Sequence, residues 1–359
     1  MTTMTPAPST VTGGVDTHAD LHVAAAVDHL GGVLGTAQFA TTPAGYRRLL
    51  GWLRTFGPLH QVGVEGTGSY GAALAVHLAE QGVEVIEVAR PNRQVRRRHD
   101  KSDIVDAIAA ARAVLSGEAS ATPKTHDGPI EGLRALKVVQ RSANKARTQA
   151  LNQLHALIAT APAELRERLR HLETDQLLRT CAAFRIPADD DSLTAVVRLA
   201  LRELAQRVQH LDGQLKTVVT RLHRITKQVA PELVALQGVG PDVASTLLIT
   251  AGDNPHRLER EQSFAAPCAA SPIPATSGKT QNRHRLNRGG DRQANAALWR
   301  IALVRLSHDP CTRDYMNRRT SEGKNKTEVL RCLKRHIARE VFAALPDTVT
   351  NTRPDQLAA

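Results

Sequence analysis

Three aspartates at intervals of three open a helical stretch in the first third of the chain. Asp100, Asp103 and Asp106 lie in RRRHDKSDIVDAIAAARAVLSG, residues 96 to 117. On a helix this spacing puts the three carboxylates on one face, where like charges repel one another unless a cation lies between them. The stretch predicts a metal ion or a phosphate neighbour. The alternative is a helix that simply begins with Ser102 as its cap and acidic residues in its first turn.

Two more carboxylates stand where predicted strands end. Asp16 ends the first strand and Glu65 ends a later one. In an α/β layer these two can converge with Asp103 and Asp106 on one edge of the sheet. Four oxygen ligands suit Mg²⁺ or Mn²⁺, and two such ions about 4 Å apart can activate a nucleophile and stabilise a leaving oxygen at a phosphodiester. If the carboxylates do not meet, Asp16 starts a turn and Glu65 pairs with an arginine.

The polar residues around these carboxylates receive structural interpretations. Asp20 and Asp28 are predicted turn residues, and Asp100 is the weakest metal candidate. His18 and His22 alternate along a strand edge, and we expect them to be polar surface rather than metal ligands.

A serine surrounded by basic residues is the second chemical candidate. Ser277 lies in PATSGKTQNRHRLNRGGDRQANAALWR, together with Lys279, Arg283, Arg285, Arg288 and Arg292. A serine attacks phosphate only when its proton has an acceptor and the charge of the phosphate is cancelled. The basic residues meet the second condition, and metal-bound carboxylates can meet the first if the domains come together. A plain Ser-Gly turn is the alternative.

The charge of the chain favours a polyanionic partner. Its 359 residues carry a formal net charge of +12, with a pI of about 10.1. Residues 279–339 hold 16 Lys and Arg against 5 Asp and Glu and form the predicted nucleic-acid surface, with a solvated basic surface as the alternative. Aromatic residues make up 3%, so phosphate contacts should outweigh base stacking. A second basic run adjoins the acidic helix, and its side chains can bind the phosphate backbone of the same nucleic acid. It consists of Arg93, Arg96, Arg97, Arg98 and Lys101.

These residues need an α/β layer to position them. GGVDTHADLHVAAAVD predicts strand, turn and strand, VLGTAQFA a third strand, and TPAGYRRLLGWLRTFG a helix. Residues 60–82 predict a buried strand, a glycine turn and a second helix, and VEVIEVA another strand. A hairpin front joined to parallel strands collects functional groups at strand ends. From Glu131 onward the pattern is helical, and we predict domains at 1–125, 126–230 and 231–359.

One helical stretch has an unbroken apolar seam. It continues for over four heptads, as in a coiled coil. Its partner is either the stretch from Leu133 to Leu157 or a second subunit, and both remain open. PADDDS, residues 187–192, precedes it as an acidic N-capping turn. The seam residues are Val197, Leu201, Leu204, Val208, Leu211, Leu215, Val218, Leu222, Ile225 and Val229.

Further along, Gly238-Val239-Gly240-Pro241 precedes another helix. Such a turn can aim free N–H groups at a phosphate in the manner of a helix-hairpin-helix motif, or it can be an ordinary helix start. Four cysteines without ligand spacing fit a reducing cytosol. No run approaches the roughly 18 apolar residues of a membrane span. We therefore expect a cytoplasmic, nucleoid-associated bacterial protein with no membrane partner.

Five stretches together resemble a known family. They are GVDTHADLHVAAAVD, VGVEGTGSYG, KSDIVDAIAAARAV, LQGVGPDVAS and TSGKTQNRHRLNRGGDRQANAALWRIAL. Their order and distances are similar to those of the insertion-sequence transposases with a DEDD metal tetrad, which are relatives of the Piv-type DNA invertases and include RNA-guided bridge recombinases. The resemblance covers nearly the whole chain. It implies a multidomain protein: an α/β N-terminal domain of the ribonuclease H and RuvC type, a helical coiled-coil middle and a mainly helical C-terminal transposase domain.

The resemblance also implies a mechanism. It assigns the Mg²⁺ or Mn²⁺ tetrad to Asp16, Glu65, Asp103 and Asp106 and the nucleophile to Ser277, whose attack leaves a transient covalent link to DNA. It implies a homo-oligomer, a dimer that becomes a tetramer in the synaptic complex, and a structured noncoding RNA from the element that pairs with donor and target DNA. Many relatives have two adjacent serines where this chain has Thr276 and Ser277, and the preceding loop CAASPIP also differs.

Three other functions fit parts of the pattern. A metal-dependent junction nuclease would use the tetrad and water without serine chemistry. An actin-like or sugar-kinase-like ATPase would use the first hairpin for phosphate, although the basic C-terminal segment argues against it. A non-catalytic nucleoid or RNA-binding protein would need none of the four carboxylates.

Overall fold

The computed structural model describes residues 10–88, 102–254, 257–274, 284–285 and 289–346. The chain forms two compact units, of which the first contains the residues up to 127 and the segment 252–259. In that segment Asn254 Nδ2 donates a hydrogen bond to the Pro123 carbonyl at 2.9 Å. The second unit contains residues 128–251 and 260–346. A further division of the helical part at residue 230 stays a prediction.

A five-stranded sheet forms the centre of the first unit. Its strands follow the order β3-β2-β1-β4-β5, with antiparallel pairing among β1, β2 and β3 and parallel pairing of β4 with β1 and β5. This confirms the predicted hairpin front joined to parallel strands and is consistent with a ribonuclease H and RuvC type of fold. The strands are β1 (Val11–Thr17), β2 (Leu21–Val27), β3 (Val33–Ala40), β4 (Leu59–Glu65) and β5 (Glu84–Val88).

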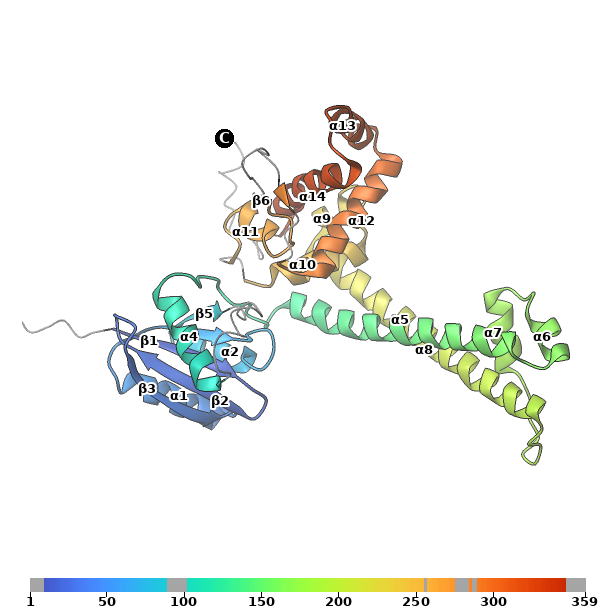
Figure 1. The fold of residues 1–359 in the computed structure, drawn as a ribbon, viewed down its shortest axis with the longest axis horizontal. Helices are drawn as coiled ribbons and strands as arrows, with labels where there is room; N and C mark the ends of the chain where they lie inside the picture. The colour runs from blue at the N-terminus through green and yellow to red at the C-terminus, as the bar shows by residue number, and fades with distance from the viewer. Residues whose placement is uncertain (1–9, 89–101, 255–256, 275–283, 286–288, 347–359) are drawn as a thin grey trace, which may run out of the picture. The chain divides into compact units, whose positions relative to one another are not determined.

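Helices cover both faces of this sheet (Figure 1). On one face α1 (Pro43–Arg54) and α2 (Ala72–Glu80) bury Leu49, Leu53 and Leu74 against apolar strand residues. On the other face α4 (Asp103–Leu115) packs its alanines against β1 and β2. Because both faces are covered, strands can be buried along their length, as β1 and nearly all of β2 are.

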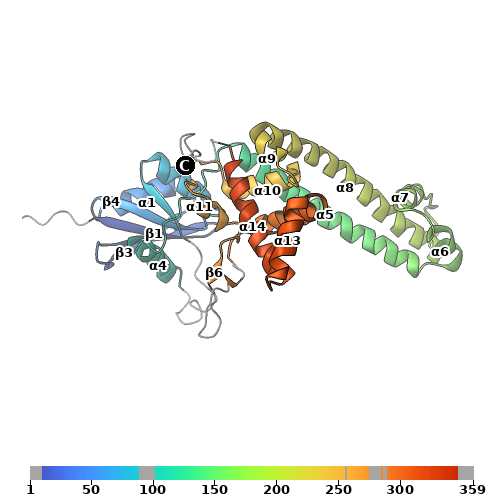
Figure 2. The ribbon, with the colours of Figure 1, turned by 90° about the horizontal axis from the view of Figure 1, so that it is seen from above.

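Two long helices dominate the first part of the second unit. α5 (Pro129–Ala159) and α8 (Leu193–Val229) run side by side and cross, as Figures 1 and 2 show from two directions. Two short helices, α6 (Ala163–Leu169) and α7 (Thr174–Ala182), close one end of the pair. The core there combines residues of all four helices, among them Leu154, Leu169 and Leu201.

The helix predicted from the apolar seam is confirmed as α8. Ser192 caps it by accepting a hydrogen bond from the Ala195 amide, as the PADDDS turn predicted. The first half of the seam, including Leu201 and Val208, packs within the chain on α5 and α7. Farther along, Leu211 is only half-buried. Pairing of two subunits along α8 stays a prediction.

The rest of the second unit is a compact group of helices with one small hairpin. The helices α12 and α14 pack together, and α11 lies against α14. Over the part of the chain that is described, no helix has both the length and the apolar character needed to cross a membrane. The elements are α9 (Pro231–Ala235), α10 (Pro241–Ala251), α11 (Glu261–Ala265), β6 (Ile273–Pro274), β7 (His284–Arg285), α12 (Arg292–His308), α13 (Pro310–Ser321) and α14 (Lys326–Ala343).

Candidate metal centre

Strand register brings two of the predicted acidic residues side by side. β1 and β4 are parallel, and Val15 is paired with Val64. Asp16 and Glu65 are the next residues on the two strands, so both lie at the same edge of the sheet. Both are buried, at 6% and 4% exposure. Thr17 Oγ1 locks the two strand ends together by donating to the Glu65 carbonyl at 2.8 Å.

Two glycines let α4 approach these strand ends closely. A Cβ at Gly14 would lie 2.2 Å from the Ala107 carbonyl oxygen, and a Cβ at Gly63 would lie 2.8 Å from that of Ala110. Gly14 and Gly63 each precede an acidic residue by two positions, so Asp16 and Glu65 face the same side of the sheet as α4. The glycines therefore allow the first turn of α4 to reach the acidic strand ends.

The first turn of α4 carries Asp103 and Asp106, and Ser102 occupies its N-cap position. The helix dipole favours carboxylates there, which supports the structural interpretation of these two aspartates as well as the metal interpretation. Asp103 nevertheless belongs to a cluster with Asp16 and His18 in which the candidate ligand atoms all lie within 4.8 Å of one another. The structure thus brings Asp16 and Asp103 together from distant parts of the sequence.

Electrostatics at Asp16 show that Asp106 also lies near this cluster. Burial raises the pKa of Asp16, the charge of His18 lowers it, and the charges of Asp106 and Asp103 raise it. A carboxyl group whose charged form is disfavoured by burial and by like charges gains most from a nearby divalent cation.

His18 is the residue that the sequence interpretation missed. Its Nε2 lies 3.1 Å from Asp16 Oδ2 and 3.4 Å from Asp103 Oδ1. The side chain is 49% exposed, as expected for a polar surface residue, but the β1–β2 turn also directs it back to the strand end. A His two residues after a strand-end Asp, followed by a short turn, was the available signal.

His22, in contrast to the half-exposed His18, is not a surface residue, because it is fully buried on the opposite face of the sheet. Its ring stacks on Tyr46, with centroids 5.7 Å apart, and Tyr46 in turn contacts His77. Among the described residues neither ring nitrogen of His22 has a hydrogen-bond partner, and burial lowers its pKa. Asp28 is confirmed as a turn residue that accepts hydrogen bonds from the Leu30 and Gly32 amides.

The donor set of the acidic cluster fits a divalent ion. Carboxylate oxygens are the ligands that Mg²⁺ and Mn²⁺ prefer, and Asp16 and Asp103 supply them at close range. Asp106 lies within electrostatic range of the same site, and Glu65 lies next to Asp16 in register. Among the described residues, Asp16, His18 and Asp103 lie close enough together to hold one ion.

Several predicted nucleic-acid contacts lie outside the described residues. Ser277 belongs to the connection between β6 and β7, and Arg285 contributes its backbone to β7 by pairing with Ile273. Arg292 is exposed at the start of α12. The residues outside the described ranges are Ser277, Arg93, Arg96, Arg97, Arg98, Lys101, Lys279, Arg283 and Arg288.

The chain segments before and after the serine-bearing region are held together by hydrogen bonds and close packing. The Asp291 amide donates to the Pro267 carbonyl at 2.7 Å, and a Cβ at Gly290 would lie 2.5 Å from that same oxygen. Asn295 donates to the carbonyls of Cys268 and Ala269 and accepts from the buried Lys334 at 2.9 Å. Residues 267–269 and 290–291 are therefore fixed to each other and to α14.

The glycine turn before α10 packs against α12. Gly238 has a φ of 80°, and a Cβ there would lie 3.3 Å from the Ile301 carbonyl oxygen. Arg305 donates to the Gln237 carbonyl at 2.9 Å and pairs with Glu340 at 2.7 Å. A Cβ at Gly240 would meet no atom within 4 Å. Gly238 thus has a packing role that the sequence did not reveal, and Gly240 is the more open position for a phosphate.

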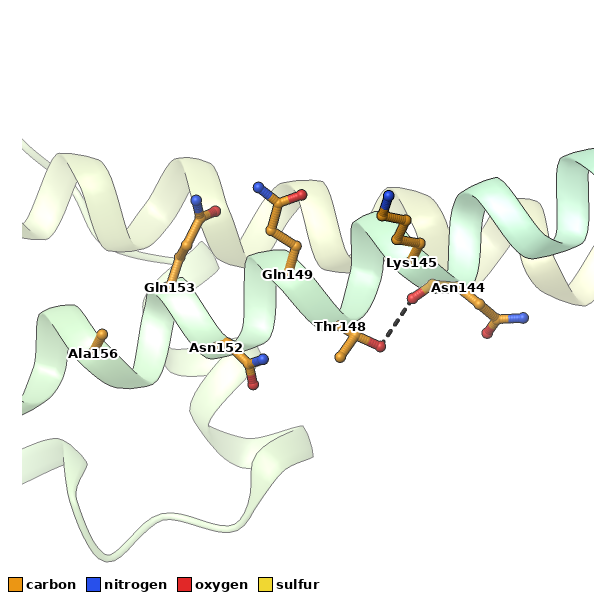
Figure 3. A pocket seen from close by; sticks show the side chains of 7 residues that line it. All are labelled: Asn144, Lys145, Thr148, Gln149, Asn152, Gln153 and Ala156. Carbon is orange, nitrogen blue, oxygen red and sulfur yellow. Dashed lines mark hydrogen bonds between the residues drawn. The ribbon is translucent and has the colours of Figure 1, made fainter. Parts of the chain in front are cut away.

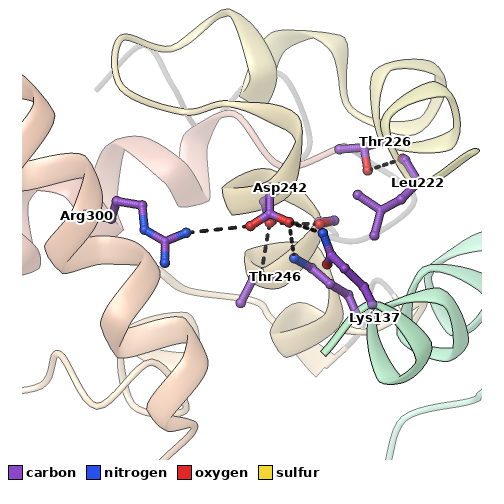
Figure 4. A network of polar contacts seen from close by, with 8 residues as sticks. Lys137, Leu222, Thr226, Asp242, Thr246 and Arg300 are labelled. Atoms are coloured by element: carbon purple, nitrogen blue, oxygen red, sulfur yellow. Dashed lines mark hydrogen bonds and ion pairs between the residues drawn. The ribbon is translucent and has the colours of Figure 1, made fainter. Parts of the chain in front are cut away.

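A polar network joins α5, α10 and α12 around Asp242 (Figure 4). Lys137 donates to its carboxylate at 2.6 Å and Gln140 at 2.9 Å, while Arg300 lies 3.6 Å away. Burial acts to raise the pKa of Asp242, but these hydrogen bonds and positive charges outweigh it and lower the pKa. Burial lowers the pKa of Lys137 in spite of this partner. The carboxylate of Asp242 is thus fully compensated by partners from the same unit, as is typical of a structural network.

Part of the positive charge of residues 279–339 is likewise paired within the unit. Glu261 accepts hydrogen bonds at 2.7 Å from both Arg335 and Arg339, and Arg319 pairs with Glu322. The long helices add a basic surface that the sequence interpretation did not single out. α8 holds seven Lys and Arg against two acidic residues, and α5 holds five against one.

A shallow groove along α5 lies on this basic pair of helices (Figure 3). Its walls offer amide donors and acceptors and one ammonium group. This is suitable chemistry for sugar and phosphate contacts. The lining residues are Asn144, Lys145, Thr148, Gln149, Asn152, Gln153 and Ala156.

Two family models match separate parts of the chain. A model of the DEDD transposases of the IS110 group, described as a transposase, matches residues 13–161. A second, described as transposase of the IS116/IS110/IS902 family, matches residues 230–317. The first match contains β1, β4 and α4, and therefore all four acidic residues, and the second contains α10 and α12.

Two curated relatives are similar over part of their length. The insertion element IS110 uncharacterized 43.6 kDa protein of Streptomyces coelicolor is 26% identical over 156 residues, or 43% of this chain and 38% of the relative. The insertion element IS900 uncharacterized 42 kDa protein of Mycobacterium paratuberculosis is 25% identical over 162 residues, or 45% of this chain and 40% of the relative. The chain thus spans about two fifths of the length of the curated relatives it matches.

The two family matches follow each other in the same order as the sheet and the helical unit, and the first of them includes the acidic cluster. Together with the two insertion-element relatives, they show that the chain belongs to the IS110 family of DEDD transposases.

Proposed function

We propose that this protein is a DNA transposase that cuts and exchanges the strands of an insertion element at a divalent metal site. The observation that carries the proposal is the convergence of Asp16 and Asp103, from distant parts of the sequence, at one sheet edge. Asp106 acts on the same carboxylate, and Glu65 is its neighbour in register. Membership in a transposase family supports the same function.

In this proposal the four acidic residues hold Mg²⁺ or Mn²⁺ over the scissile phosphodiester. Bound divalent ions would supply charge stabilisation for the phosphoryl group and the leaving oxygen. The burial of Asp16 and Glu65 supports this role, because a buried carboxylate keeps a fixed orientation toward its ligand.

Ser277 is the proposed nucleophile. Its Oγ forms a bond to phosphorus while the bond from phosphorus to one deoxyribose oxygen breaks, and that oxygen takes up a proton. The hydroxyl proton of Ser277 passes to a carboxylate of the acidic site, which can come from another subunit. The resulting phosphoserine ester is then attacked by a hydroxyl of the exchanged strand, which restores the serine. The basic residues that follow Ser277 in the sequence support this role because they cancel phosphate charge.

The proposed partners are the element ends, the target DNA and a structured noncoding RNA from the element. Basic residues on α5, α8 and the segment 279–339 are the proposed contacts to these polyanions. The half-buried part of the α8 seam, with the exposed Val138 and Val139 on α5, supports pairing of two subunits. Two such pairs would form the tetramer of the synaptic complex.

A covalent adduct tests the serine step. The full chain is incubated with element-end DNA, the element RNA and Mg²⁺, and is then denatured and separated by electrophoresis. We expect a protein–DNA adduct that Ser277→Ala abolishes and that the neighbouring Thr276→Ala retains. Omitting the RNA should also prevent the adduct.

Each other outcome points to a different function. DNA cleavage that is unchanged in Ser277→Ala would indicate a metal-dependent junction nuclease that uses water. Activity that survives neutralisation of Asp16, Glu65, Asp103 and Asp106 would indicate a nucleic-acid-binding protein without metal chemistry and would overturn the proposal.

A further inference from the structure

The position of His18 extends the acidic site by one residue. Its ring nitrogen Nε2 lies 3.1 Å from Asp16 Oδ2 and 3.4 Å from Asp103 Oδ1. We propose that His18 is a nitrogen ligand of the divalent ion and that the site prefers a transition-metal ion such as Mn²⁺ to Mg²⁺. This inference rests on the proposed function, which places the ion among the acidic residues.

The spacing of the three donor atoms matches a shared ion. In an octahedral site with bonds of about 2.1 Å, neighbouring ligand atoms lie about 3 Å apart and opposite ones about 4.2 Å apart. The two measured separations from Nε2 are close to the first value, and all three atoms lie within 4.8 Å of one another. A small inward movement of three side chains would complete the coordination.

The backbone fixes His18 at this point. Its carbonyl accepts a hydrogen bond from Thr41 Oγ1 at 3.3 Å, and the Thr41 amide donates to the Asp20 carbonyl at 3.0 Å. The β1–β2 turn is thus held from the start of α1. The side chain itself is 49% exposed, so an ion can reach the ring nitrogen from solvent.

Chemistry decides the choice of ion. Imidazole binds first-row transition ions well, whereas Mg²⁺ prefers oxygen ligands and keeps much of its water. A site of carboxylates alone would distinguish Mn²⁺ from Mg²⁺ less. His18 therefore gives the site a selectivity that the four acidic residues do not supply.

The alternative is that His18 only orients Asp16 through a hydrogen bond and never touches the ion. Both roles give the same distance in the metal-free protein. They differ in the surroundings of a bound ion, because only a ligand places a nitrogen in direct contact with it.

Mn²⁺ alone is the probe that separates the two roles. Pulsed electron paramagnetic resonance of Mn²⁺ bound to the full chain should show coupling to an imidazole nitrogen, and His18→Ala should remove it. We expect the affinity for Mn²⁺ to fall about tenfold or more in His18→Ala and the affinity for Mg²⁺ to fall less. His29→Ala, in the exposed β2–β3 turn of the same unit, is the matched control.

A second variant separates ligation from positioning. His18→Gln keeps an N–H group that can donate to Asp16 but has no imidazole nitrogen, and its amide oxygen suits Mg²⁺ and Mn²⁺ alike. We therefore expect the nitrogen signal to be missing and the preference for Mn²⁺ over Mg²⁺ to be lost in this variant. An unchanged preference for Mn²⁺ in this variant, or bound Mn²⁺ without nitrogen coupling in the unchanged chain, overturns the inference and leaves the proposed function standing. No Mn²⁺ binding by the unchanged chain, with or without DNA, overturns both.

Discussion

Asp16 in the first unit and Asp242 in the second are both aspartates packed against a helix, yet their pKa values move in opposite directions. Burial acts to raise the pKa of both. At Asp16 the nearby carboxylates Asp106 and Asp103 add to this effect, and the pKa is raised. At Asp242 the hydrogen bonds and charges of Lys137, Gln140 and Arg300 outweigh burial, and the pKa is lowered.

The difference separates a structural carboxylate from one suited to an external ligand. Asp242 faces the positive charges of Lys137 on α5 and Arg300 on α12, within its own unit, so the folded chain already compensates its charge. Asp16 has one half-exposed histidine and two like charges nearby, so a divalent cation would improve its surroundings. Carboxylates of the second kind are the ones to test for catalysis.

The largest expected effect is on activity. Asp16→Asn should lower strand cleavage about a thousandfold, because metal ions contribute several kcal/mol of charge stabilisation and about 1.4 kcal/mol corresponds to a factor of ten. The metal-free variant should unfold at a higher temperature than the unchanged chain, since a disfavoured charge has been removed. Cleavage assays and calorimetry measure the two effects, and Asp20→Asn in the adjoining turn is the control. A fully active Asp16→Asn protein would contradict the metal site.

The opposite result is expected in the second unit. Asp242→Ala leaves Lys137, whose side chain is 6% exposed, as a buried charge without its carboxylate. We expect the free energy of unfolding to fall by about 2–3 kcal/mol, below the usual cost of breaking a buried pair because Asp242 is 39% exposed. Denaturant unfolding measures this. Asp212→Ala, which removes the partner of the half-exposed Arg147, should cost about 0–1 kcal/mol. Equal losses in both variants would remove the distinction.

A glycine substitution tests whether helix packing positions the acidic cluster. In Gly14→Ala the new methyl group meets the α4 backbone, so we expect a loss of about 1–3 kcal/mol in unfolding free energy. The displacement of α4 should also weaken Mn²⁺ binding, because Asp103 and Asp106 move with the helix. Gly51→Ala, on an open face of α1, should be neutral or slightly stabilising. Unchanged Mn²⁺ affinity in Gly14→Ala would show that the cluster does not depend on this contact.

The smallest effect concerns pH. Burial lowers the pKa of His22 below its ordinary value of 6.5, and the charge of His18 lowers it further. Below pH 6.5 the unfolded chain takes up a proton that the folded chain does not, so the first unit loses stability until the pH falls below the lowered pKa. Asp242, by contrast, stabilises the second unit fully above pH 3.8, its ordinary pKa. This stabilisation is lost only as the pH falls through its lowered pKa.

Hydrogen exchange of β2 and α10 between pH 7 and 5 checks this difference. After correction for the intrinsic pH dependence of amide exchange, we expect the protection factors of β2 to fall as the pH falls and those of α10 to change little. His22→Phe keeps an aromatic ring against Tyr46 and should flatten the response of β2. If β2 of this variant responds like that of the unchanged chain, His22 is not the cause.

The order of elements could be predicted from the sequence because local patterns encode it. Short apolar runs on either side of a polar loop marked β1 and β2, and Pro43 marked the start of α1. The uninterrupted apolar seam predicted a single long helix, which is α8. The pairing of α5 with α8 was left open, because a seam carries the same pattern whether its partner is in the same chain or another.

The acidic residues of the candidate metal site could be selected from the sequence, but the neighbouring histidine could not. Strand ends and a short acidic turn were enough to select Asp16, Glu65, Asp103 and Asp106. The closeness of His18 to Asp16 depends on the geometry of a tight turn, and the burial of His22 depends on which face of β2 meets Tyr46. The packing role of Gly238 depends on α12, which lies far along the sequence. Each of these features arises from tertiary contacts that one sequence does not display.

The contact between residues 267–269 and 290–291 affects how the sequence between them can be altered. Because the Asp291 amide and the Pro267 carbonyl hold its two ends together, the intervening segment can be exchanged or lengthened without pulling on α12. Closing a flexible insert costs only about 0.6 kcal/mol for each doubling of its length. Grafting the corresponding segment of another family member between these two attachment points is therefore a practical way to change that segment while the helices keep their packing.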